Sequence, residues 1–193
     1  MTIEKEITVE TKLSREELDS ILKSKGFKIV KEYSVIDEYM AQKGQVSLDN
    51  ALETLSKSVL VREIISDENQ KLLMYKYKKY NDKKEIVKQG SIKCPIESIE
   101  KAKELLNALD YSKLFSINDH VTVYTNKESE LHVQEVNNKH LYIEVEMTCN
   151  SIDKKYINVD DMIKDLEKYY IPYDNSNYFV KKAEIELLES LKK

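Results

Sequence analysis

Apolar and polar residues alternate in many segments of the chain, and this two-residue period predicts β-strands. Near the N-terminus, Ile7 and Val9 are apolar, and the residues on either side of them are polar or charged. Further segments show the same period, are rich in β-branched and aromatic residues, and are separated by turn clusters or hairpin signals. The expected strands are 3–12, 27–40, 59–65, 71–80, 85–94, 114–124, 130–136 and 140–147.

Other segments show the spacing of amphipathic helices. Ser14 and Glu17 form a capping box, and apolar residues follow at helical spacing until Gly26, which is expected to end this first helix. The last strand pair is joined at Asn137 and Asn138, a hairpin signal. Further helices are expected at 48–57, 98–109, 162–170 and 178–191.

This order of elements predicts the fold class. About eight strands and four or five helices occur without strict strand–helix–strand alternation, which favours an antiparallel α+β domain over a doubly wound parallel sheet. We find neither an internal repeat nor a break in composition, so a single domain is expected over 1–193, with a C-terminal helical segment at about 159–193. A glycine-rich phosphate loop is absent, which excludes nucleotide binding of the P-loop type.

Charge and cysteine content narrow the functional classes. The chain has 193 residues, and its 31 Lys and Arg against 35 Asp and Glu give a net charge of -4. This near-balance argues against a nucleic-acid partner. No apolar run reaches the roughly 20 residues that span a bilayer, so no membrane partner is expected. Cys94 and Cys149 are far apart and predict free, at least partly buried thiols in a cytoplasmic protein.

The predicted strands carry charges on single faces. Glu144 and Glu146 share one face of their strand, and Lys76 and Lys78 share one face of another strand. In a third strand, Arg62 lies on one face and the apolar residues Val59 and Val61 lie on the other. One interpretation is the solvated face of an ordinary antiparallel sheet. The alternative is a closed barrel whose charged faces line a polar tunnel, where carboxylates hold a hard cation and Lys or Arg bind phosphate oxygens.

These segments resemble the CYTH superfamily, the triphosphate tunnel metalloenzymes, which includes class IV adenylate cyclases and thiamine triphosphatases. The resemblance covers roughly 3–147 and is strongest in 131–136 followed by 141–146, with Asp37-Glu38-Tyr39 as a supporting motif. It implies an eight-stranded antiparallel tunnel or open barrel with helices packed outside. It also implies Mg²⁺ or Mn²⁺ as cofactor, a triphosphate-type small molecule as ligand, and a chain that is able to form a homodimer.

The alternation and the resemblance together indicate two groups of site residues. Crowded carboxylates repel one another, so at least one carboxyl in the metal group is expected to have a raised pKa. No catalytic residue is assigned, and His132 and His140 are expected to be surface or strand-end residues rather than ligands. The expected metal ligands are Glu6, Glu10, Glu144 and Glu146, and the expected phosphate-binding residues are Arg62, Lys76 and Lys78.

The chain departs from the family pattern at several positions. Leu60, Val121 and Gln134 stand where the family has, or is able to have, charged groups, and His120 is the only basic candidate in the late basic strand. The opening Glu-x-Glu-x-Lys motif is incomplete in every register, although each register keeps carboxylates on one face. The expected function is binding of a triphosphate or other polyanionic phosphate ligand with a divalent metal, with weak metal-dependent triphosphatase activity. The alternatives are a non-catalytic ligand- or protein-binding module and, ranked lower, a class IV adenylate cyclase.

Overall fold

The computed structural model describes residues 6–42, 44, 51–80 and 86–192, with the side chains of 78–80 and 86–89 outside this description. The described residues form two compact units. Unit 1 consists of Val35–Asn118 and Lys181–Lys193, and unit 2 consists of Lys5–Ser34 and Asp119–Val180. The prediction of a single domain over 1–193 stays a prediction.

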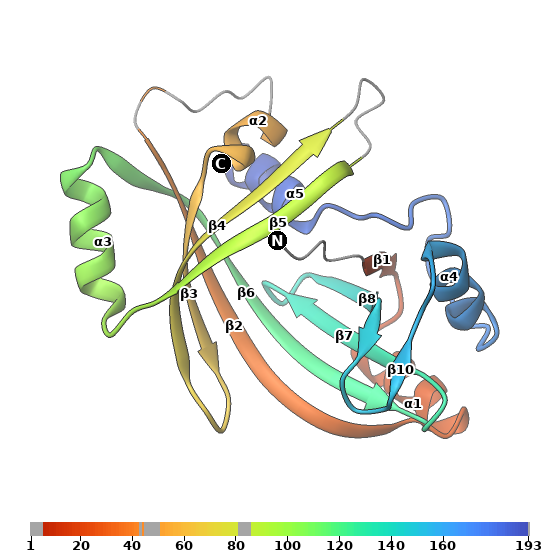
Figure 1. Cartoon of the computed structure of the whole chain (residues 1–193). Helices are drawn as coiled ribbons and strands as arrows, with labels where there is room; N and C mark the ends of the chain where they lie inside the picture. The colour runs from red at the N-terminus through yellow and green to blue at the C-terminus, as the bar shows by residue number, and fades with distance from the viewer. Residues whose placement is uncertain (1–5, 43, 45–50, 81–85, 193) are drawn as a thin grey trace. The chain divides into compact units, whose positions relative to one another are not determined.

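Eight strands form one antiparallel sheet, as the sequence predicts (Figure 1). Its hydrogen-bonded order is β1-β8-β7-β6-β2-β3-β4-β5. Among the described residues β1 and β5 are the two ends of this order, so the sheet is not closed into a barrel. The strands are β1 (Glu6–Thr11), β2 (Lys28–Gln42), β3 (Val59–Ile65), β4 (Gln70–Tyr80), β5 (Ile86–Pro95), β6 (Tyr111–Thr125), β7 (Glu130–Val136) and β8 (His140–Glu146).

Unit 2 has its core on one face of β1, β8 and β7. Helix α1 (Arg15–Ser24) begins at the predicted capping box of Ser14 and Glu17 and ends before Gly26, whose φ of 82° suits glycine. Leu18 and Leu22 of α1 are fully buried in this core. Helix α4 (Val159–Glu167) contributes two further buried residues to the same core. The two helices therefore cover the apolar face of these strands.

The outer edge of β1 is covered by the chain that follows α4. The backbone N–H of Thr8 donates to the carbonyl of Tyr178, and the N–H of Val180 donates to the carbonyl of Thr8. The N–H of Asp174 also donates to the carbonyl of Glu10 at 2.8 Å. These bonds satisfy an edge that would otherwise be open to pairing with another chain.

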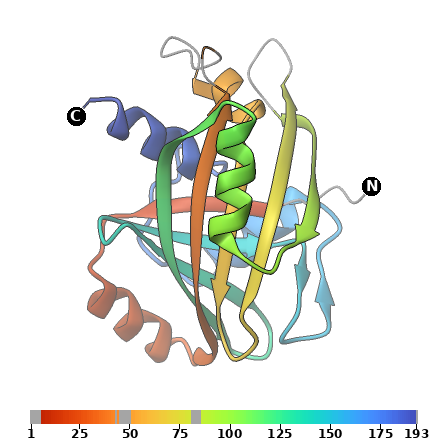
Figure 2. The same ribbon diagram turned by 90° about the vertical axis from the view of Figure 1, so that its left-hand side faces the viewer.

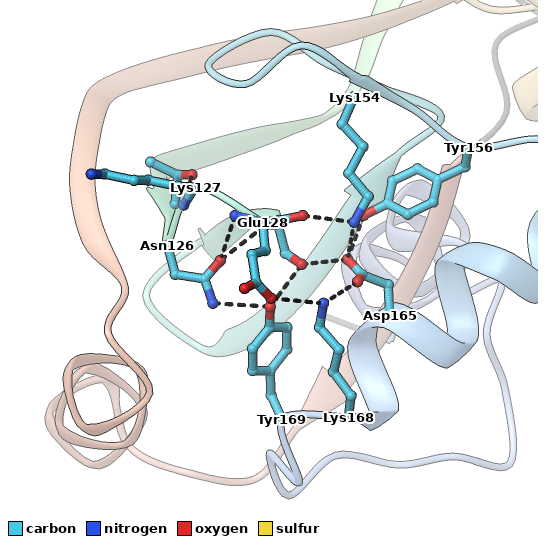
Figure 3. A network of polar contacts seen from close by, with 10 residues as sticks. Asn126, Lys127, Glu128, Lys154, Tyr156, Asp165, Lys168 and Tyr169 are labelled. Carbon is cyan, nitrogen blue, oxygen red and sulfur yellow. Dashed lines mark hydrogen bonds and ion pairs between the residues drawn. The ribbon is translucent and has the colours of Figure 1, made fainter.

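A polar network attaches α4 to the loop between β6 and β7 (Figure 3). Asp165 is 9 % exposed and accepts hydrogen bonds from Ser129 and Tyr156, and it forms ion pairs with Lys154 at 3.0 Å and Lys168 at 2.6 Å. The contacts come from α4, from this loop and from the two-stranded sheet of β9 (Thr148–Cys149) and β10 (Lys154–Lys155). Neither β9 nor β10 is among the strands expected from the sequence pattern.

Unit 1 has a smaller core under helix α3 (Ile99–Ala108). Ala102 and Leu106 of α3 pack with Met40 of β2 and Val61 of β3, and Figure 2 shows the helix lying along these strands. The unit also contains α2 (Ala51–Ser56) and α5 (Lys182–Ser190), which contact one another. The expected helices at 48–57, 98–109 and 178–191 are thus found with shorter bounds, whereas α4 begins and ends three residues before the expected helix at 162–170.

Two further expectations concern the cysteines and membrane-spanning helices. Both cysteines are free, as predicted, but only Cys149 is buried, whereas Cys94 is exposed near the end of β5. In the described part of the chain no helix is both long and apolar enough to cross a bilayer. The cytoplasmic location stays a prediction.

Candidate functional site

The predicted acidic residues meet on one face of unit 2. In the β1–β8 pair, Glu6 lies opposite Glu146, Thr8 opposite Glu144, and Glu10 opposite Tyr142. Directly opposed residues of an antiparallel pair project to the same side of the sheet. The other side carries the apolar residues that pack under α1 and α4. The alternation therefore places all four predicted carboxylates on the face opposite the helices.

This face is not the solvated side of an ordinary sheet. Glu144 is 6 % exposed, and His132 and Gln134 of β7 are buried to a similar degree. The hydroxyl of Thr8 donates to a carboxylate oxygen of Glu144 at 3.3 Å. Since buried charges need partners, the face must balance its carboxylates locally.

His132, Glu144 and Glu146 form a cluster with the composition of a metal site. One ligand atom from each residue lies within 4.8 Å of the other two. His132 sits directly opposite Glu144 in the β7–β8 pair, and Glu146 follows two residues later on the same face. Two carboxylates and an imidazole are suitable ligands for a divalent cation. Both carboxylates are predicted ligands, whereas His132 is expected to be a surface or strand-end residue. The structure instead buries His132 and places it within this cluster.

A buried carboxylate orients His132. Nε2 of His132 lies 3.1 Å from a carboxylate oxygen of Glu130, which is 2 % exposed. Glu130 also accepts the backbone N–H groups of Asn150 and Ser151. Burial by itself would raise the pKa of Glu130, but the hydrogen bonds from Ser151, His132 and Asn150 lower it below the ordinary value. Glu130 therefore stays charged and fixes the imidazole ring.

Glu10 lies on the same face but already has two partners of its own. One of its carboxylate oxygens is 3.0 Å from Nζ of Lys12 and 3.1 Å from Nδ1 of His140. Burial would raise the pKa of Glu10, but these two neighbours lower it. The expected raised pKa is thus not found at Glu10. Glu6, opposite Glu146, is the predicted β1 ligand that lies nearer to the cluster in the strand register.

The predicted basic residues belong to unit 1. Arg62 of β3 forms a two-bond ion pair with Asp37, with its Nε 2.6 Å from one carboxylate oxygen. By strand register, Arg62 lies opposite Leu72, which alternates onto the same face of β4 as Lys76. Arg62 and Lys76 therefore share the face of unit 1 opposite α3. Lys78 lies in β4, and its side chain is outside the described residues.

The replaced family positions are uncharged and buried. Leu60 is 1 % exposed, and Val121 and Gln134 lie directly opposite one another in the β6–β7 pair. His120 is one residue away from Val121 and so alternates to the other face, where its ring is 3.3 Å from the hydroxyl of Ser34. No charge is gained at these positions, so the described polar faces carry fewer cations than the family pattern implies.

Comparison with known proteins supports the fold. No family model matches the chain, and no curated protein matches it either. Among solved structures, the PH1819 protein from Pyrococcus horikoshii OT3 has a TM-score of 0.63 at 18 % identity and covers 98 % of this chain and 99 % of its own. HpAC1 from Hippeastrum, named as a candidate adenylyl cyclase with a dominant triphosphatase activity, has a TM-score of 0.63 at 14 % identity and covers 97 % of this chain and 96 % of its own.

A third neighbour is a candidate adenylate cyclase from Vibrio parahaemolyticus, with a TM-score of 0.59 at 12 % identity, covering 100 % of this chain and 99 % of its own. Identities this low establish the fold and leave the activity to be argued from the site. The comparisons thereby support the fold that the strand motifs predict: this chain shares with these structures an α+β fold built on an eight-stranded antiparallel sheet.

Proposed function

We propose that this protein binds a triphosphate or other polyanionic phosphate ligand together with a divalent metal ion, and that it hydrolyses triphosphates weakly. The observation that carries the proposal is the cluster of His132, Glu144 and Glu146 on the polar face of a CYTH-like sheet. The triphosphatase activity named for the HpAC1 protein, which shares this fold, gives a reason to begin with triphosphates. Glu6 and Glu10 are further proposed ligands on the same face.

The two groups of predicted site residues have separate roles in this proposal. The carboxylates of unit 2 hold Mg²⁺ or Mn²⁺, which when bound neutralises phosphate charge and orients the scissile group. In unit 1, Arg62, Lys76 and Lys78 bind phosphate oxygens through charge-assisted hydrogen bonds. Because Asp37 already holds the guanidinium of Arg62 in two hydrogen bonds, part of the hydrogen-bonding capacity of Arg62 is already used.

The expected rate is low because charges are missing where the transition state needs them. Leu60, Val121 and Gln134 supply no cation or carboxylate, and charges of this kind stabilise the transition state more than the bound ground state. Their replacement is expected to lower the rate of hydrolysis more than the affinity. The same observation favours a second candidate function, a binding module without catalysis.

The test measures tripolyphosphate binding and phosphate release in one Mg²⁺ buffer, and then again with Mn²⁺. Lys76→Ala is expected to weaken binding about tenfold or more, the effect of losing one charge-assisted contact. Arg62→Ala is made together with Asp37→Ala, so that no carboxylate is left buried without its partner, and a smaller loss is expected. Lys101→Ala, on the exposed surface of α3, is the matched control and should bind like the wild type.

Three outcomes separate the candidate functions. Binding with slow phosphate release supports a weak triphosphatase, and binding without release supports the binding module. Formation of cyclic AMP from ATP in the same buffer would indicate a cyclase instead. Absence of tripolyphosphate binding with either metal, or unchanged binding after Lys76→Ala, contradicts the proposal.

A further inference from the structure

The distances in the His132 cluster suit a shared cation better than a direct hydrogen bond. Nδ1 of His132 is 3.8 Å from a carboxylate oxygen of Glu146, which is longer than an N–H···O hydrogen bond of about 3 Å. Two ligand atoms on one ion, each bonded at about 2.1 Å, are typically about 3–4 Å apart. The spacing therefore leaves room for an ion between the ring and the carboxylates.

The orientation of His132 determines which ring nitrogen faces this space. A carboxylate only accepts hydrogen bonds, so the contact of 3.1 Å between Nε2 and Glu130 requires the proton to be on Nε2. In the neutral ring the lone pair is then on Nδ1, the ring nitrogen that lies 3.8 Å from a carboxylate oxygen of Glu146. Metal-binding histidines are commonly oriented in this way by a carboxylate on the second nitrogen.

The three residues are close enough to share one ion. One ligand atom from each of His132, Glu144 and Glu146 lies within 4.8 Å of the other two, and His132 and Glu144 are buried. The 3.8 Å between Nδ1 of His132 and Glu146 is too long for a direct hydrogen bond but falls within the spacing of two ligand atoms on one ion.

We propose that His132 is a metal ligand and gives this site a preference for Mn²⁺, Co²⁺ or Zn²⁺ over Mg²⁺. This inference rests on the metal site of the proposed function. Mg²⁺ favours an all-oxygen shell that retains several waters, whereas imidazole nitrogen is a good ligand for the later divalent metals. The Glu130–His132 pair thus adds metal selectivity to a site that the sequence predicted from carboxylates alone.

The experiment titrates Co²⁺, Mn²⁺ and Mg²⁺ separately into the full chain by calorimetry, without any phosphate ligand. His132→Gln is expected to lower Co²⁺ affinity at least tenfold and Mg²⁺ affinity by less than about twofold. His120→Gln is the matched control, because His120 lies on the other face, and it should leave both affinities unchanged. Glu144→Gln should weaken binding of every metal.

A second measurement needs no variant. The chain has three histidines, so the ring nitrogens are readily followed by ¹⁵N NMR as Zn²⁺ is added. Zn²⁺ is expected to shift the Nδ1 signal of one ring and leave its Nε2 protonated, whereas Mg²⁺ should shift neither. Zn²⁺ binding that leaves all three rings unchanged would overturn the inference, even if His132→Gln fails to fold.

The outcomes distinguish this inference from the proposed function. If the metals bind and only Glu144→Gln lowers their affinity, the metal site is supported and the proposed role of His132 is wrong. If Co²⁺ binds through His132 but tripolyphosphate is not bound, the inference stands and the proposed function is wrong. If no divalent ion binds the wild type, both are wrong.

Discussion

Asp165 is a buried anion whose charge depends on four neighbours (Figure 3). Burial would raise its pKa, but contacts with Lys168, Ser129, Tyr156 and Lys154 lower it to about 2. A carboxyl whose pKa is lower in the folded chain than in the unfolded chain adds stability above its unfolded value near 4. That contribution is lost as the pH falls from about 4 to about 2. After allowance for solvent screening it amounts to roughly 1–2 kcal/mol.

We therefore expect Asp165→Asn to be less stable than the wild type at pH 7, with a difference that shrinks by roughly 1–2 kcal/mol by pH 2. The free energy of unfolding, measured in urea at several pH values, checks this. Asp153→Asn, at an exposed position of the same region, is the control and should show no such trend. A constant difference between Asp165→Asn and the wild type across this range would contradict the role given to the charge.

At the residue level, alternation along a strand is sufficient to predict that the two carboxylates share a face, but not to predict that His132 lies on that face. Glu144 and Glu146 share a face in any register because they are two residues apart. The face of His132 depends on the loop between β7 and β8, whose three residues pair Val136 with His140 and so His132 with Glu144. A two-residue loop would have turned His132 to the opposite face. Ion pairs between residues far apart in the sequence, such as that of Arg62 with Asp37, likewise cannot be predicted from the local sequence pattern.

The hairpin between β7 and β8 places two asparagines in a backbone conformation that most residues rarely adopt. Asn137 and Asn138 have φ values of 51° and 55°, in the left-handed region that favours glycine. Asparagine tolerates this region better than most residues, which is why the pair is a hairpin signal. The turn sets the register of β7 against β8 and therefore the geometry of the candidate metal site.

We expect Asn138→Gly to raise the free energy of unfolding by about 0.5 kcal/mol, because glycine adopts a positive φ without a steric cost. Asn107→Gly is the opposite control: Asn107 is exposed in helix α3, where glycine should lower stability by a similar amount. Urea unfolding of the two variants measures both effects. Equal changes of the same sign would show that the turn conformation does not determine the result.

At the level of elements, the strongest patterns gave accurate bounds. β3 and β7 begin and end at the predicted residues, since alternation and flanking turn residues mark both ends. β2 and β6 are each 15 residues long and contribute to both compact units. The alternation of apolar and polar residues does not show at which residue such a strand leaves one unit and enters the other. β9 and β10 have two residues each, which is too short for any period.

For the molecule as a whole, ligand binding and folding are linked. A ligand that binds only the folded chain stabilises it by about 2.7 kcal/mol at a hundred times its dissociation constant. For a chain of this size we expect Mn²⁺ with tripolyphosphate to raise the thermal midpoint by about 5–10 °C. Differential scanning fluorimetry measures the shift. Glu144→Gln should lose most of it, Lys101→Ala should keep it, and an equal shift in both variants would exclude the proposed metal ligands.

The pairing of β1 has a consequence for the order of events during protein synthesis. β1 is among the first described segments of the chain, yet its partner β8 is made more than a hundred residues later, and the segment that covers its outer edge is made later still. Unit 2 is interrupted by the whole of Val35–Asn118. A nascent chain must therefore carry β1 unpaired while the middle of the protein emerges from the ribosome. The carboxylates of β1 and β8 come together only after the ribosome has passed residue 146, so no shorter fragment is expected to bind metal as the full chain does.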